Sequence, residues 1–138
     1  MSQRNEFEGG CLCGALRYRC ATPPLDAGYC HCRLCQRSTG APVLVWATFP
    51  FDRFAYTQGT PALYRSSAHG VREFCATCGT QIAYRTFADA RTIDVNVGSL
   101  DNPAGVPPRR HVWTASRIPW FDTRDELPRQ PGEGSDPA

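Results

Sequence analysis

The chain has 138 residues, eight cysteines and a formal net charge of +2 at pH 7. This length suits one domain with its own core, so the sequence predicts a single domain over residues 1–128. The nearly balanced charge, with basic residues scattered among acidic ones, argues against nucleic acid as a partner. A polar N-terminus and the lack of a long apolar run predict a soluble, cytoplasmic protein with no signal peptide and no membrane contact. In that reducing compartment, the cysteines are expected to bind metal rather than to form disulfides.

Short apolar runs separated by glycine and proline predict a series of short strands. The first run is Ala15–Cys20, which ends before two consecutive prolines. After the cysteine-rich stretch, residues 36–39 predict a short helical turn that Gly40 ends. The run 43–49 is apolar and rich in β-branched and aromatic residues, which favours a buried strand. Further strands are expected at 54–57, 62–66, 71–74, 81–86 and 92–97.

The C-terminal third has a different composition. Residues 102–108 predict a loop, 109–113 an edge strand, and 118–121 an apolar segment that packs back on the sheets. Residues 129–138 are rich in Pro, Gly, Ser and Asp, and they predict a disordered tail. Many short strands, with no amphipathic helix of three turns, predict a mainly β fold.

Two cysteine pairs have the form of zinc-binding turns. Cys75 and Cys78 are separated by two residues, Cys11 and Cys13 by one, and a glycine follows each pair. Such turns supply two ligands from one short piece of backbone, and glycine permits the left-handed conformation that they often need. Because a structural zinc ion takes four ligands in a tetrahedron, the two pairs together predict one closed zinc site.

Three of the other cysteines, Cys30, Cys32 and Cys35, lie within six residues of sequence. They are close enough to bind a second ion, and a zinc ion with three protein ligands and one open position is typical of a catalytic site. The sequence leaves the fourth ligand open. Cys20 is expected to be a small buried residue of a strand rather than a ligand.

The ligand set of this second site favours one kind of chemistry. Three thiolates overcompensate the double charge of zinc, so the ion is expected to activate water or a carbonyl less well than a three-histidine site does. Zinc of this type is suited to binding a further sulfur, because binding deprotonates the thiol. The set therefore favours thiol chemistry over hydrolysis.

Five segments together carry a resemblance to a known family. They are Gly9–Tyr18, Cys30–Arg37, Phe74–Thr80, His111–Trp113 and Pro119–Phe121. In their order and spacing they resemble the glutathione-dependent formaldehyde-activating family, whose domain also occurs in centromere protein V. The resemblance extends from about Gly9 to Pro128.

The resemblance implies an Mss4-like fold of short antiparallel sheets built around two zinc ions per chain. It assigns to the structural site Cys11, Cys13, Cys75 and Cys78, and to the catalytic site Cys30, Cys32 and Cys35. It also implies a carbon–sulfur lyase that reversibly forms S-hydroxymethylglutathione from glutathione and formaldehyde. A small thiol, such as glutathione, is the implied partner.

The residues around the second cysteine group suggest a mechanism. A substrate thiol is expected to take the open position, lose its proton and add to an aldehyde carbonyl. Arginine side chains suit the two carboxylates of glutathione, and each such arginine has the alternative role of a solvated surface residue. The candidate partners are Arg33 and Arg37, together with Arg109 and Arg110.

Four further polar residues lie in or beside these motifs. Ser38 and Thr39 are expected either to donate to a bound oxygen or to complete the helical turn. His31 lies between two ligands and is expected to point away from the metal, whereas His111 is expected to pack with a hydrogen bond rather than to act in catalysis.

Three interpretations of the cysteines compete. The first is a zinc-dependent enzyme that acts on a thiol adduct. The second is a binding module with two structural zinc ions, in which His31, His111 or Cys20 closes the second site. The third is a redox protein whose cysteines cycle through disulfides. The sequence does not predict an oligomeric state.

Overall fold

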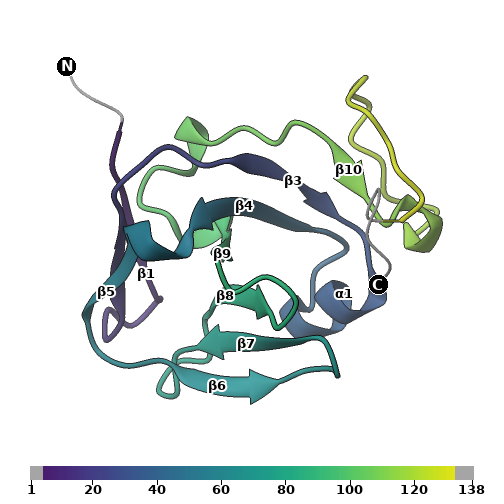
Figure 1. Ribbon diagram of the computed structural model, residues 1–138. Helices are drawn as coiled ribbons and strands as arrows, with labels where there is room; N and C mark the ends of the chain where they lie inside the picture. Colours follow the sequence, from purple (N-terminus) through teal and green to yellow (C-terminus); the bar gives the residue numbers. More distant parts are fainter. Residues whose placement is uncertain (1–4, 133–138) are drawn as a thin grey trace.

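The computed structural model describes residues 5–132, which form two β-sheets and one short helix (Figure 1). The strands are β1 (Phe7–Gly10), β2 (Arg17–Cys20), β3 (Asp26–Cys30), β4 (Leu44–Pro50), β5 (Phe54–Gln58), β6 (Ala62–Arg65), β7 (Gly70–Phe74), β8 (Gln81–Thr86), β9 (Thr92–Asn96) and β10 (His111–Val112). The helix is α1 (Arg33–Thr39), and short 3-10 turns occur at Phe51–Arg53, Val97–Ser99, Pro103–Gly105 and Thr114–Ser116. The prediction of a mainly β fold is confirmed.

The two sheets differ in size and in strand direction. The smaller sheet has the order β1-β2-β5 and is antiparallel throughout. The larger sheet has the order β10-β3-β4-β9-β8-β7-β6, and it is antiparallel except at its edge, where β10 runs parallel to β3. A parallel pair needs a long crossover connection, and here the chain from β3 to β10 passes through most of the molecule.

The predicted elements lie close to the observed ones. The strand 81–86 has the predicted bounds, and Gly40 ends α1 in the left-handed conformation, with φ of 70°. The helix begins three residues earlier than predicted, because the side chain of Cys32 caps it by accepting a hydrogen bond from the Cys35 amide. The predicted edge strand 109–113 is reduced to the two residues of β10. Strands β1 and β3 were not predicted.

The hydrophobic core lies between the two sheets. It contains Tyr18 from β2, Phe49 from β4 and Ile93 from β9, all at most 1% exposed. Cys20 belongs to this core and is fully buried. Its predicted role as a small buried residue agrees with this position, and burial raises the pKa of its thiol to about 12.

The larger sheet carries a second, more polar face. Ile93 and Val95 point into the core, so the alternation of β9 turns Asp94 and Asn96 to the opposite face. Strand pairing extends this face across the sheet, because residues paired in antiparallel strands share a face. Tyr84 lies opposite Asp94, and Arg72 lies opposite Tyr84.

The segment after β10 folds back beside that strand (Figure 1, yellow). The amide of His111 donates to the Pro128 carbonyl at 2.8 Å, and that of Gln130 donates to the His111 carbonyl at 3.0 Å. The predicted tail was placed from Arg129 onward, but the hydrogen-bonded chain continues to Gly132, whose carbonyl accepts from the Trp113 amide. Residues 133–138 of the predicted tail lie outside the described part of the chain.

The predicted apolar segment 118–121 packs only in part. Phe121 lies 6.4 Å from His31 between ring centroids, whereas Trp120 is 76% exposed. No helix within residues 5–132 is long and apolar enough to cross a membrane.

Candidate active site

The first cysteine cluster joins two turns that are far apart in sequence. Its members are Cys11, Cys13, Cys75 and Cys78, whose sulfur atoms all lie within 4.8 Å of one another. The Sγ of Cys13 lies 3.7 Å from that of Cys11 and 3.8 Å from that of Cys75. A tetrahedron of sulfurs around zinc at ~2.3 Å has edges of about 3.8 Å, whereas a disulfide bond is about 2.05 Å long. The spacing therefore fits a zinc ion and is too long for a disulfide bond.

Both turns of this cluster are shaped for thiolates. Gly14 and Gly79 follow the pairs with φ of 86° and 83°, in the region that favours glycine. The amides of Leu16 and Cys78 donate to cluster sulfurs at 3.2 and 3.4 Å. Hydrogen bonds from the side chain and backbone of Thr80 lower the pKa of the Cys78 thiol to about 5. At Cys78 the donors thus favour the ionised form that a metal requires.

The second cluster is formed by Cys30, Cys32 and Cys35, which the end of β3 and the start of α1 bring together. Hydrogen bonds with Cys30 and Cys35 lower the pKa of Cys32 to about 2, and the contact with Cys32 raises the pKa of Cys30. Three sulfurs within 4.8 Å of one another cannot all ionise unless a cation lies among them. This donor set fits a soft cation such as zinc.

No further His, Cys, Asp or Glu of residues 5–132 joins the second cluster. Cys20 lies in the core between the sheets, in a different hydrophobic cluster from Cys30 and Cys35. The ring of His31 is turned to His111 instead, with 2.9 Å between Nε2 and Nδ1. The described residues therefore offer three ligands at this position.

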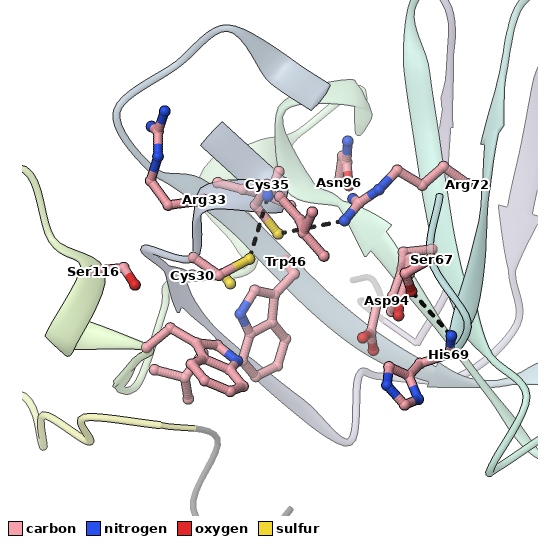
Figure 2. A pocket seen from close by; sticks show the side chains of 16 residues that line it. Cys30, Arg33, Cys35, Trp46, Ser67, His69, Arg72, Asp94, Asn96 and Ser116 are labelled. Atoms are coloured by element: carbon pink, nitrogen blue, oxygen red, sulfur yellow. Dashed lines mark hydrogen bonds between the residues drawn. The ribbon is translucent and has the colours of Figure 1, made fainter. Parts of the chain in front are cut away.

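All three cysteines line a cavity of about 300 Å³ on the polar face of the larger sheet. Its apolar walls are Leu34, Leu44, Trp46, Tyr84, Val112 and Trp113. Its polar side chains are Arg33, Ser67, His69, Arg72, Asp94, Asn96 and Ser116. Figure 2 shows Cys30 and Cys35 on one side, Ser67, His69 and Asp94 on the other, and Arg72 extending toward Cys35. A space with apolar walls and a few convergent polar groups is typical of a small-molecule site.

The polar side of this cavity was not predicted. Arg72 is 6% exposed, its Nη2 lies 4.0 Å from the Cys35 sulfur, and its guanidinium stacks on Tyr84 at 4.7 Å. The Asp94 carboxylate accepts a hydrogen bond from Thr48 at 2.6 Å. In the predicted strand 92–97, Asp94 and Asn96 alternate with the apolar residues Ile93, Val95 and Val97. Only the strand register, however, places Arg72 and Tyr84 beside them.

The predicted arginine partners lie in different places. Arg33 lines the cavity, and Arg37 lines a neighbouring groove that shares Leu34 and Arg72 with it. Arg109 is exposed, and Arg110 forms an ion pair with Asp26 at 2.8 Å. The structure thus brings Arg33 and Arg37 near the second cluster.

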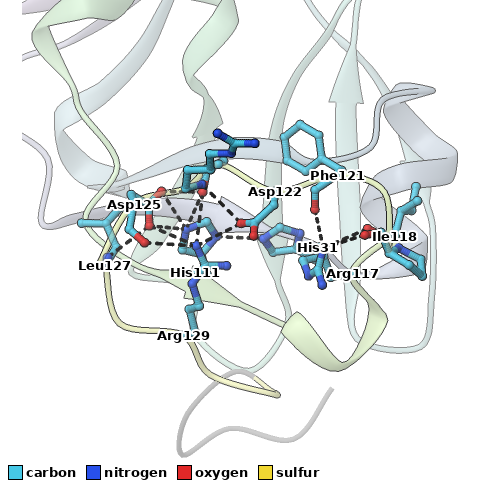
Figure 3. Close-up of polar contacts among 12 residues, drawn as sticks. His31, His111, Arg117, Ile118, Phe121, Asp122, Asp125, Leu127 and Arg129 are labelled. Carbon is cyan, nitrogen blue, oxygen red and sulfur yellow. Dashed lines mark hydrogen bonds and ion pairs between the residues drawn. The ribbon is translucent and has the colours of Figure 1, made fainter.

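A buried chain of hydrogen bonds supports the loop of the second cluster (Figure 3). His111 is fully buried, its Nδ1 lies 2.9 Å from Nε2 of His31, and its Nε2 lies 3.0 Å from the Asp125 carboxylate. An ionised Asp125 carboxylate can only accept, so Nε2 of His111 carries a proton and donates to it. In the neutral ring, Nδ1 of His111 is then an acceptor, and it accepts from a proton on Nε2 of His31. The structure thus turns His31 away from the second cluster and packs His111 with hydrogen-bond contacts, and both placements agree with the predictions.

Ser38 and Thr39 complete the helix. Both hydroxyls donate to the Cys35 carbonyl, at 3.2 and 2.7 Å. Of the two predicted roles, the structure therefore supports the helical one.

Comparison with known proteins gives three similarities. Residues 6–116 match the family model described as glutathione-dependent formaldehyde-activating enzyme. An uncharacterized lyase of Schizosaccharomyces pombe is 31% identical over 87 residues, which cover 57% of this chain and 57% of that protein. The match thus spans little more than half the length of this curated relative. A Rhodobacter sphaeroides protein of known crystal structure shares the fold, with a TM-score of 0.56 and 22% identity over 88% of this chain and 98% of the other.

Proposed function

The chain belongs to the glutathione-dependent formaldehyde-activating enzyme family, and from this premise we propose that it is a zinc-dependent carbon–sulfur lyase. The proposed reaction is the reversible formation of S-hydroxymethylglutathione from glutathione and formaldehyde, in the cytoplasm. One observation carries the proposal: three clustered cysteines, with no fourth ligand among residues 5–132, line a cavity of substrate size. A binding module would be expected to close its second site with protein ligands.

The two clusters have different proposed roles. Cys11, Cys13, Cys75 and Cys78 would hold a structural zinc ion, and Cys30, Cys32 and Cys35 would hold a catalytic one. When bound, the catalytic ion supplies a soft Lewis acid that favours the ionised form of a substrate thiol. The cysteines would also orient the substrate sulfur toward the cavity.

The cavity residues would position the rest of the substrate. Trp46 and Trp113 form apolar walls that keep water from the reacting atoms. Arg33 at the cavity and Arg37 at the neighbouring groove are the proposed partners of the two glutathione carboxylates. The groove has a volume of about 480 Å³, which would extend the site enough for a tripeptide.

The test is the replacement of Cys32 by Ser, with zinc content and exchange measured together. Because the uncatalysed addition is fast, exchange between ¹³C-formaldehyde and its glutathione adduct is followed by NMR with and without protein. The proposal predicts one zinc ion per chain instead of two, a retained fold, and loss of the protein-dependent exchange. A wild-type protein that does not accelerate exchange with glutathione or other small thiols contradicts the proposed function. Two zinc ions with full exchange in the variant would exclude the assigned site.

A further inference from the structure

Arg72 is a buried cation beside the second cluster. It lies on β7 and is 6% exposed, yet no carboxylate of residues 5–132 forms an ion pair with it. Its neighbour Glu73 points to the other face, where it pairs with Arg85. A buried charge is costly unless it has a partner, so Arg72 needs an anion nearby. Among residues 5–132, the acidic group that Arg72 contacts is the thiol of Cys35, which becomes anionic when it binds a metal ion.

The guanidinium has donors to spare. Its Nε donates to Ser66 Oγ at 3.1 Å, and its Nη2 makes a long contact of 4.0 Å with the Cys35 sulfur. A guanidinium carries five N–H donors in a fixed fork, so these contacts leave several without a partner. Among the described residues, the one buried side-chain nitrogen or oxygen that is sealed without a partner is His31 Nδ1. The remaining Arg72 donors are therefore not sealed, since Arg72 lines both the cavity and the neighbouring groove, and Figure 2 shows the guanidinium extending toward Cys35 at the cavity.

The position of these donors relative to the cysteines indicates what they bind. A substrate sulfur held at the second cluster lies beside Cys35, and Arg72 reaches the same point from the opposite side of the cavity (Figure 2). In the adduct of a thiol with an aldehyde, the oxygen is only two bonds from the sulfur. A substrate bound through its sulfur therefore brings this oxygen to the guanidinium.

We propose that Arg72 is a catalytic residue that donates hydrogen bonds to the aldehyde oxygen as the carbon–sulfur bond forms or breaks. The inference rests on the proposed function and names the group that stabilises charge in that reaction. Donors fixed toward the atom where negative charge develops lower the barrier, because they need no reorganisation during the step. Stacking on Tyr84 and the bond to Ser66 hold the fork in place.

The step balances without a redox partner. The thiolate sulfur donates an electron pair to the carbonyl carbon, and the π pair of the C=O bond moves to oxygen. Arg72 stays protonated throughout, because a guanidinium does not lose its proton in proteins. The alkoxide takes a proton from water, which replaces the proton that the thiol released. In the reverse direction the hydroxyl returns this proton to water, and the sulfur leaves as thiolate.

A purely structural role gives a different expectation. If Arg72 only balanced the charge of the thiolates, its loss would weaken the metal site and thiol binding. If it binds the aldehyde oxygen, its loss would slow the bond-forming step and leave zinc and thiol binding unchanged. The two roles are therefore separable by measurement.

The experiment compares Arg72→Met, Arg72→Lys and the control Arg65→Met in the full-length, zinc-loaded protein. Arg65 is also a strand arginine stacked on an aromatic ring, 4.8 Å from Phe87, but it lies outside the cavity. We measure the catalysed exchange rate at saturating glutathione, the glutathione Kd by calorimetry and the zinc content by native mass spectrometry. We expect Arg72→Met to lower the rate about 100-fold, Arg72→Lys to lower it less, and Arg65→Met to leave it unchanged. Zinc content and glutathione Kd stay at wild-type values in all three.

Two results overturn the inference while the proposed function stands. One is a wild-type exchange rate in folded Arg72→Met and Arg72→Lys. The other is loss of the second zinc ion, or an equal loss of glutathione affinity and rate, in both folded variants. A wild-type protein that catalyses no exchange overturns the proposed function and the inference together. Arg72→Lys keeps the test valid if Arg72→Met does not fold, because it retains the buried charge.

Discussion

The two cysteine clusters differ in how the chain assembles them. The first draws its sulfurs from two turns, and the contact from Cys13 to Cys75 spans 62 positions of sequence. The second takes all three sulfurs from the single stretch 30–35 and faces a cavity. An ion in the first cluster therefore fastens distant parts of the chain together, whereas an ion in the second adds little to the connectivity of the fold. We infer that a cluster built across the fold serves stability, and one built within a single segment is free for chemistry.

The largest expected effect comes from breaking the first cluster with Cys75→Ser. A structural zinc ion contributes about 10–16 kcal/mol of binding free energy in small zinc domains, which matches or exceeds the ~5–15 kcal/mol stability of a typical domain. We expect this variant to be unfolded, by circular dichroism, at temperatures where Cys32→Ser is folded. The same contrast is expected with a chelator, which should remove one zinc ion before the fold is lost. A folded Cys75→Ser protein with one zinc ion would abolish the distinction between the clusters.

A smaller effect is expected from Asp125→Asn, which weakens the support of the second cluster alone. Asp125 holds His111 at 3.0 Å, and hydrogen bonds to charged groups contribute about 1.5–3 kcal/mol. We expect the free energy of unfolding to fall by about that amount. Hydrogen exchange should increase around residues 30–35 and 111–112, but not at the turns of the first cluster. Faster exchange at Cys75–Cys78 would mean that the two clusters are not independent.

The smallest effect is expected from Cys20→Ala, which tests whether this cysteine belongs to neither cluster. We expect two zinc ions, wild-type exchange of formaldehyde, and a stability loss of about 1–2 kcal/mol from the small cavity. The folded pKa of Cys20 is raised to about 12, above its unfolded value of about 8.5. The contribution of the buried thiol to the free energy of unfolding is therefore complete below pH 8.5. It declines by about 1.4 kcal/mol per pH unit as the pH rises toward 12.

Urea unfolding of the wild type and Cys20→Ala at pH 7 and pH 10 measures this pH dependence of the Cys20 contribution. The difference in unfolding free energy should become smaller at pH 10. A constant difference would indicate that Cys20 is not fully desolvated, and loss of a zinc ion would make it a ligand.

The strands that the sequence predicted are those whose residues favour strands on their own. The unpredicted strand β3 contains Asp26 and Gly28, which disfavour strands. Gly28 is needed because a Cβ there would lie 2.8 Å from the Arg110 carbonyl oxygen and 2.9 Å from the Trp46 ring. Packing against adjacent segments, rather than the preference of its own residues, stabilises such a strand. A single sequence does not reveal which segments will be adjacent.

In the candidate site, too, local features of the sequence were predicted, and features that depend on the folded sheet were not. The cysteines were identifiable because ligand spacing is a local property of the sequence. Arg72, Tyr84 and Asp94 were not identified, since they come from three strands and meet only through the register of the sheet. The placement of each histidine was predictable from its position in the sequence. The hydrogen-bonded chain to Asp125 was not, because it forms only when the C-terminal segment folds back.

The short sequence span of Cys30–Cys35 has a consequence for the order of events during synthesis. These three cysteines are synthesised together, 40 positions before Cys75. We infer that a nascent chain can bind its first metal ion at this stretch, for which we propose the catalytic role, before the rest of the fold exists. Connectivity would then decide which cluster is filled first when zinc is scarce, even if the folded protein binds zinc more tightly at the other. Isolation of ribosome-bound chains with and without Cys32→Ser, followed by measurement of their zinc content, would reveal this order.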